Sequence, residues 1–220
     1  MSLSARLMQL IIDSGGRESL PMKPIPLIVA FLPLVTFSVL ARLLPAGDFG
    51  IAALVAAAIA AVALIAFRPI WPPKIIQGCS LVLFAGLAIA GFVAGHDDDR
   101  WLSRWGGAGV AVVMGVVILL LIPLMPFTEQ FARQTVPRAQ WSSPVFKKVN
   151  RVLSAAWGVA IVAIGASRVV AAIIDRHTPH SRPLVLLFSA IVPVAIALYM
   201  LIFSRSYPER VTHQAALTPR

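Results

Sequence analysis

Residues 49–67 read FGIAALVAAAIAAVALIAF, a stretch without a single charged or strongly polar side chain. A helix rises about 1.5 Å per residue, so a segment of this length can cross the roughly 30 Å of hydrocarbon in a bilayer. A membrane strand would instead alternate apolar and polar residues over about ten positions. Because backbone groups in lipid must bond within their own segment, this continuous apolar block predicts a transmembrane helix.

Similar apolar blocks lie on both sides of this stretch. The predicted spans are residues 25–44, 49–67, 75–94, 107–127, 152–174 and 184–203. The composition agrees, because 59% of the 220 residues are hydrophobic and only 13% are charged, against about 25% charged in soluble domains. We therefore predict an all-α integral membrane protein with a six-transmembrane-helix bundle over residues 25–203.

The ends of the chain are polar. In the leader, residues 1–24, Leu3, Leu7, Leu10 and Ile11 recur at helical spacing. This pattern predicts a short amphipathic helix over residues 2–14 in the membrane interface, and a frayed terminus is the alternative. Residues 204–220 form a predicted cytoplasmic tail.

The Lys and Arg residues between spans predict the orientation. Most of them fall in the leader, the second and fourth connections and the tail, which share one side of a six-span protein. Cytoplasmic loops carry an excess of Lys and Arg, so both termini should be cytoplasmic. The chain is therefore predicted to be a multi-pass membrane protein.

The fifth span is expected to begin in the cytoplasm. Ser143 followed by Pro144 matches an N-cap with proline at the first helical position. Lys147, Lys148 and Arg151 would then lie at the anionic headgroups of the lipid bilayer. A docking surface for a partner protein is the alternative interpretation.

Small residues predict close helix packing. Ala53, Ala57 and Ala61 recur every four residues, and residues 91–95 match a small-xxx-small pattern. Such spacing lets backbones approach within one chain or between copies, so a homo-oligomer is compatible with it. Prolines lie within spans or near their ends, where they can kink or break a helix. These prolines are Pro33, Pro123, Pro126 and Pro193.

The sequence contains few patterns typical of catalytic, metal-binding or nucleic-acid-binding sites. The formal net charge is +10, but its basic residues lie between apolar blocks, so no nucleic-acid partner is predicted. His96 with Asp98, and His177 with His180, lie on the predicted outer side and are weak metal-ligand patterns. We predict no metal, no cofactor and no enzymatic activity. Arg168 lies inside a span, where a charge suggests a functional site, although snorkelling to the headgroups is the favoured interpretation.

Three local strings resemble the intracellular septation protein A family of bacterial inner-membrane-spanning proteins. The first, FLPLV at residues 31–35, contains Pro33, and the second, HDDDRWL at residues 96–102, contains His96 and Asp98. The third runs from Trp141 through KVN at residues 148–150 to Trp157. The order of these strings relative to the spans also agrees with the family.

The resemblance implies a multi-pass protein of the bacterial inner (plasma) membrane, with a non-catalytic role in cell envelope maintenance and cell division. Such a protein would act through division or envelope-synthesis membrane proteins as partners. The candidate functional residues that follow from it, together with the intramembrane arginine, are Pro33, His96, Asp98, Trp141, Asn150, Trp157 and Arg168.

Two other function classes remain as alternatives. A small oligomeric transporter or channel would use breaks at Pro123 and Pro126 and Arg168 as an anion-attracting charge. It would need a polar cavity, for which the spans supply few groups. A metal-assisted enzyme on the outer face, using His96, Asp98, His177 and His180, ranks last.

Overall fold

The computed structural model describes residues 24–45, 48–66, 75–93, 96–134, 136–178 and 181–217. These residues are helical and contain no strand, which confirms the predicted all-α class. The elements are α2 (Pro24–Leu43), α3 (Phe49–Ala66), α4 (Ile75–Val93), α5 (His96–Leu121), α6 (Phe127–Ala132), η2 (Arg138–Gln140), α7 (Pro144–His177), α8 (Arg182–Leu186), η3 (Leu187–Ile191) and α9 (Val192–Leu217).

Several helices have the length and composition of membrane spans. The 5 that qualify are Phe49–Ala66, Ile76–Val93, Trp101–Leu121, Pro144–His177 and the continuous segment Arg182–Val211. α2 contributes a shorter apolar segment, Val29–Leu43. The described helices therefore have the lengths and composition of a multi-pass membrane protein.

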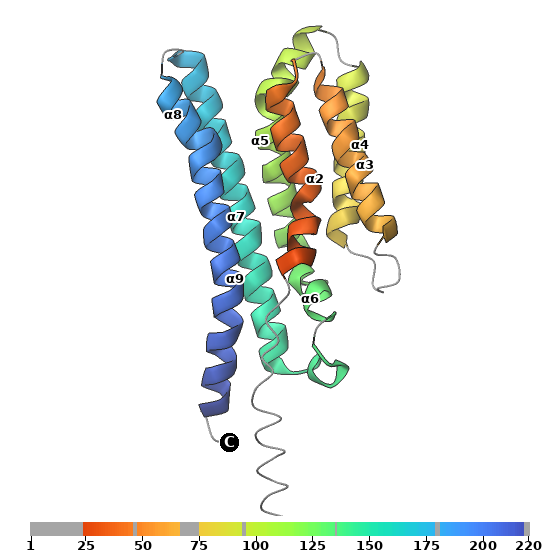
Figure 1. Ribbon diagram of the computed structural model, residues 1–220, viewed down its shortest axis with the longest axis vertical. Helices are drawn as coiled ribbons and strands as arrows, with labels where there is room; N and C mark the ends of the chain where they lie inside the picture. Colours follow the sequence, from red (N-terminus) through yellow and green to blue (C-terminus); the bar gives the residue numbers. More distant parts are fainter. Residues whose placement is uncertain are drawn as a thin grey trace, which may run out of the picture.

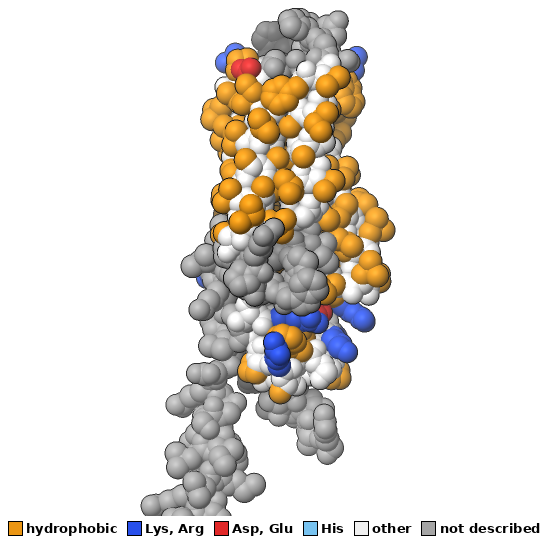
Figure 2. All heavy atoms as spheres, turned by 90° about the vertical axis from the view of Figure 1, so that its right-hand side faces the viewer, with side chains coloured by type: hydrophobic (Ala, Val, Ile, Leu, Met, Phe, Trp, Pro, Cys, Tyr) orange, Lys and Arg blue, Asp and Glu red, His pale blue; other side chains and the backbone are white. Residues whose placement is uncertain are grey.

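The long helices stand roughly side by side and alternate in direction (Figure 1). α3 packs along α4, α2 packs on α3, and α7 packs along α5, with α9 on the other side of α7. The short helix α6 lies near the end of the bundle where α7 begins (Figure 1). Figure 2 shows apolar side chains over the upper part of one face and Lys and Arg side chains gathered below them.

Small residues let the helix pairs approach closely, as the sequence pattern predicts. Ala53 and Ala57 are buried on the inner face of α3. A Cβ atom placed on Gly91 of α4 would lie 2.7 Å from the Cα atom of Gly50. Between α5 and α7 the contact depends on glycines that we did not predict, namely Gly115, Gly158 and Gly165.

α7 starts where the capping pattern predicts. The Ser143 hydroxyl accepts a hydrogen bond from the Phe146 N–H at 3.2 Å, and Pro144 occupies the first turn. The helix therefore begins before residue 152, where we expected the apolar span to begin. Its 34 residues correspond to about 51 Å, which exceeds the roughly 30 Å hydrocarbon thickness, so α7 extends beyond the membrane.

The four predicted helix-breaking prolines lie at different places relative to the helices. Pro33 lies inside α2, which continues through it. Pro123 and Pro126 follow the end of α5 at Leu121, so the span predicted at 107–127 corresponds to a helix that begins and ends earlier. Pro193 follows the π-helical turn η3.

The π-turn has an identifiable cause in Pro193. A proline nitrogen has no hydrogen to donate to the preceding turn, so carbonyls of that turn need other partners. The carbonyl of Ser189 accepts a hydrogen bond from the Arg42 guanidinium of α2. The carbonyl of Phe188 accepts one from the Ser167 hydroxyl of α7 at 2.6 Å. Side chains from two other helices therefore hold this turn.

Some predictions fall outside the described residues. These are the interfacial helix at residues 2–14 with most of the leader 1–24, the connection at residues 67–74, His180, and the last residues of the tail.

Candidate functional site

The most polar buried region of the described chain is α6. Pro126 precedes the helix, and every residue from Phe127 to Ala132 is buried. Among them, Thr128, Glu129 and Gln130 are polar or charged. Buried polar groups destabilise a fold unless they are hydrogen-bonded, so the partners of these side chains determine what the segment does.

Thr128 joins α6 to α7. Its hydroxyl donates to the backbone carbonyl of Asn150 at 2.9 Å and lies 2.9 Å from the Ser154 hydroxyl. The Thr128 backbone N–H donates to the same Ser154 oxygen at 3.2 Å. A buried side chain and a helix N-terminal N–H are thus satisfied together, which holds the first turn of α6 on α7.

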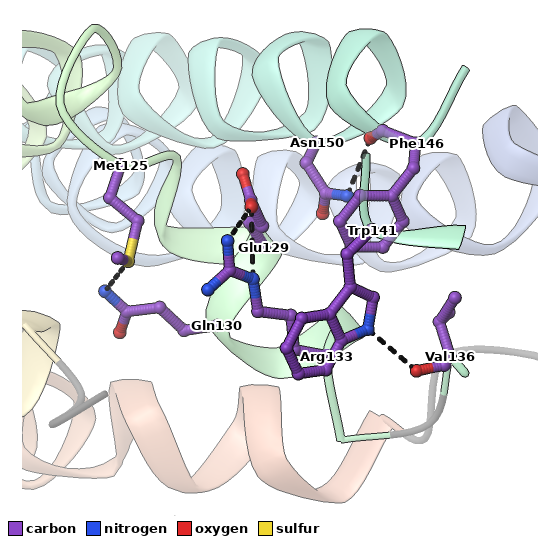
Figure 3. A network of polar contacts seen from close by, with 8 residues as sticks. All are labelled: Met125, Glu129, Gln130, Arg133, Val136, Trp141, Phe146 and Asn150. Atoms are coloured by element: carbon purple, nitrogen blue, oxygen red, sulfur yellow. Dashed lines mark hydrogen bonds and ion pairs between the residues drawn. The ribbon is translucent and has the colours of Figure 1, made fainter. Parts of the chain in front are cut away.

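Glu129 is paired with Arg133 at the end of α6, and the Arg133 guanidinium lies over an aromatic ring (Figure 3). The Arg133 guanidinium binds the Glu129 carboxylate with N···O distances of 3.1 and 2.5 Å. The guanidinium carbon lies 4.9 Å from the centre of the Trp141 ring, a cation–π contact. The Trp141 indole N–H donates to the carbonyl of Val136 at 2.9 Å. Trp141 therefore folds the connection back onto α6.

Asn150 and Trp157 lie on the buried face of α7. The Asn150 amide nitrogen donates to the carbonyl of Phe146 at 2.8 Å (Figure 3), while its amide oxygen is buried and has no hydrogen-bond partner among the described residues. The Trp157 indole N–H donates to the Ser204 hydroxyl of α9 at 2.9 Å. The Trp157 ring stacks on Phe31 of α2 with a centroid distance of 4.9 Å. Trp157 thus joins three helices.

The structure brings part of the predicted residue set together. Trp141, Asn150 and Trp157 lie along the first half of α7 and the connection before it, where α6 packs. Pro33 is fully buried in α2, two residues from the ring that stacks on Trp157. These four positions belong to the same end of the bundle or its adjoining core.

The remaining predicted residues lie elsewhere. The backbones of His96 and Asp98 form the first turn of α5, at the other end of that helix from α6, and their side chains lie outside the described residues. Arg168 is also distant from α6, in the second half of α7. Its Nη1 donates to the Ser38 hydroxyl of α2 at 2.9 Å, so it reaches into the bundle. His177 is exposed at the end of α7.

Sequence reasoning missed α6 itself. Its signal is the pair of prolines at 123 and 126 with Thr128, Glu129 and Gln130 shortly after them. We assigned the prolines and Phe127 to the end of a span, and the residues from 128 onward to a connection. A short helix with half of its residues polar gives no amphipathic stripe, so its burial is not visible in the sequence.

No protein-family model, curated protein or solved structure matches this chain. Within the residues that the structure describes, no three or more His, Cys, Asp or Glu side chains are grouped as ligands of a metal ion.

Proposed function

We propose that this chain is a non-catalytic bacterial inner-membrane protein, similar to septation protein A, that acts in envelope maintenance and cell division through membrane protein partners. The observation that carries the proposal is the convergence of Trp141, Asn150 and Trp157 around α6. The third string of the family resemblance thus includes the part of α7 on which α6 packs. Glu129 of α6 is paired with Arg133, and the Thr128 hydroxyl bonds the Ser154 hydroxyl of α7, an arrangement suited to holding a fixed surface.

The proposal includes six spans with both termini in the cytoplasm. α2 supports the sixth span, because it is a helix of 20 residues that packs on α3. The charges support the orientation, because Lys147, Lys148 and Arg151 are exposed at the α6 end of the bundle. Cytoplasmic segments next to spans are rich in such residues.

The surface that would meet partners is the cytoplasmic turn before α7. Arg138 and Gln140 of η2 are exposed, and so are Lys147, Lys148 and Arg151 of α7. The three α7 residues would contact anionic headgroups, each contributing about 1 kcal/mol. η2 precedes α7 in the chain and is followed by Trp141, whose ring contacts Arg133 at the end of α6, so it is the better candidate for protein contacts.

Photocrosslinking in cells tests this proposal. A photoreactive amino acid at the exposed Gln140 should capture division or envelope-synthesis membrane proteins. The matched control carries the same amino acid at Val82, which is 75% exposed on an apolar helix and should capture none of them. Identical capture from both positions, or normal septation and envelope integrity in a deletion strain, would contradict the proposal.

The transport alternative has less support. A transport path needs a wet, polar cavity at bilayer depth, whereas the inner face of α3 is packed with alanines. These buried residues are Ala52, Ala53, Ala56, Ala57 and Ala60. Gln77 and Ser80 of α4 are buried polar residues, but Ser80 donates to its own helix at the Ile76 carbonyl.

A further inference from the structure

An open pocket of about 610 Å³ lies at the opposite end of the bundle from α6. Four elements form it, namely α2, α5, α7 and the segment α8–η3. The charged residues that line it are Arg42, Arg104, Arg168 and Asp175. Three guanidinium groups therefore face one carboxylate, so the pocket carries a net positive charge.

Arg168 forms the inner part of this pocket. It is partly buried, and one terminal nitrogen is held by Ser38. Its Nε is buried and makes no hydrogen bond to any described residue. The side chain passes beside Gly107 of α5, where a Cβ atom would lie 3.6 Å from Nη1. A buried guanidinium N–H without an acceptor is a costly group that an anion would satisfy.

Arg42 is positioned by the π-turn. Its guanidinium donates to the Ser189 carbonyl, to which the nitrogen of Pro193, four residues further on, cannot donate. The Arg42 and Arg168 charges are close enough to act on each other. Arg104 of α5 is exposed at the rim. Like charges held together in a partly desolvated pocket favour a bound anion that they can share.

Part of the pocket lining is apolar. Leu44, directly after α2, and Val185 of α8 line it, and their neighbours in sequence, Leu43, Leu184 and Leu186, are 74%, 46% and 56% exposed. A ligand in this place would have an anionic group among guanidiniums and hydrocarbon against leucines. Arginine pairs with phosphate through two parallel hydrogen bonds, and a lipid headgroup supplies phosphate and hydrocarbon in one molecule.

We propose that this arginine pocket binds the phosphate of an anionic phospholipid headgroup. In the proposed orientation the lipid would belong to the outer leaflet. The pocket would bind phosphate whether or not the chain acts in septation, because it lies at the other end of the molecule from the cytoplasmic turn.

A binding measurement on the purified full-length protein in detergent tests the site. The probes are dihexanoyl phosphatidylglycerol, dihexanoyl phosphatidylcholine and inorganic phosphate, each titrated by calorimetry. We expect phosphatidylglycerol to bind more tightly than the other two probes. Arg168→Gln should weaken that binding by about tenfold or more, since it removes a charge-assisted contact.

Two further variants make the result interpretable. Arg104→Gln alters an exposed rim residue and should weaken phosphatidylglycerol binding without affecting folding. Arg176→Gln is the matched control, because Arg176 is an exposed arginine of α7 that does not line the pocket. Equal phosphatidylglycerol affinity in wild type, Arg104→Gln and monodisperse Arg168→Gln would overturn the site. Tighter binding of inorganic phosphate than of phosphatidylglycerol would overturn the lipid assignment.

Discussion

At the scale of single residues, buried hydroxyl groups decide how α6 and α9 are attached to α7. Thr128, Ser154 and Ser204 are each at most 4% exposed, and all of them hydrogen-bond across helices or to a neighbouring segment. Hydrogen bonds of this kind in membrane proteins contribute about 0.6 kcal/mol on average and up to about 1.7 kcal/mol. They are modest individually, but they leave an unpaired polar group when one partner is removed.

Replacement of Thr128 by valine tests the attachment of α6. Valine keeps the shape of the side chain but loses the bonds to the Asn150 carbonyl and the Ser154 hydroxyl. We expect a loss of about 1–2 kcal/mol in the free energy of unfolding, measured by denaturant titration in mixed micelles. Thr128→Ser keeps the hydroxyl, so its free energy of unfolding should fall by less than that of the valine variant. A valine variant as stable as wild type would contradict the role given to this hydroxyl.

Replacement of Ser204 by alanine tests the junction at Trp157. The variant leaves the buried indole N–H without its acceptor, so we expect a loss of about 1 kcal/mol in unfolding free energy. The same titration checks it, with Ser142→Ala as control, because Ser142 is exposed. An equal loss of unfolding free energy in the two variants would show that the hydrogen bond between Trp157 and Ser204 contributes nothing to stability.

At the scale of elements, the contact between α5 and α7 depends on glycines as well as on large apolar side chains. A Cβ atom on Gly165 would lie 2.6 Å from Val112 Cγ2 and 2.9 Å from the Val112 backbone nitrogen. Real side chains do not tolerate such approaches, and the backbone of α5 cannot move without disturbing its own helix. Because hydrocarbon tails are as apolar as leucine, close backbone packing is a principal source of helix association in lipid.

Gly165→Ala should therefore destabilise the protein, whereas Gly109→Ala should not. No atom lies within 4 Å of a Cβ at Gly109, and alanine favours helix over glycine by about 1 kcal/mol. We expect a lower melting temperature in detergent for Gly165→Ala and an unchanged or higher one for Gly109→Ala. If the melting temperature of Gly165→Ala were equal to or higher than that of Gly109→Ala, the close-approach explanation would fail.

Element boundaries show where local patterns suffice. The capping pair Ser143 and Pro144 was recognisable because an N-cap needs only residues within one turn. The end of α5 was not recognised, because the apolar character continues past Leu121 while prolines end the helix. The π-turn before Pro193 depends on donors from α2 and α7, which no local pattern reveals.

At the scale of the whole molecule, the two ends of the bundle differ in chemistry. At one end lies α6, a buried polar segment with exposed Lys and Arg side chains around it. At the opposite end lies the arginine pocket. α7 connects them, with Asn150 and Trp157 near its start and Arg168 in its second half. The surface that Figure 2 shows between the two ends is largely apolar, as expected of a surface in lipid.

The proposed topology places Met1 and Arg220 on the same side of the membrane. Fusions of green fluorescent protein at each end should fluoresce in a bacterial host, and alkaline phosphatase at the same positions should be inactive. Phosphatase inserted between residues 46 and 47, after α2, should be active. Opposite results for the two termini would contradict six spans and favour an odd number.

The sequence by itself determined the membrane class, the positions of the apolar helices and the cap of α7, because hydrophobicity and capping are properties of neighbouring residues. It also indicated Trp141, Asn150, Trp157 and Arg168 as notable positions, without saying what they contact. Only the tertiary structure decided that α6 is buried and that Arg168 meets Ser38, a residue 130 positions away. Such contacts depend on which helix faces meet, and in lipid that choice is made by glycine packing and buried hydrogen bonds rather than by hydrophobic pattern.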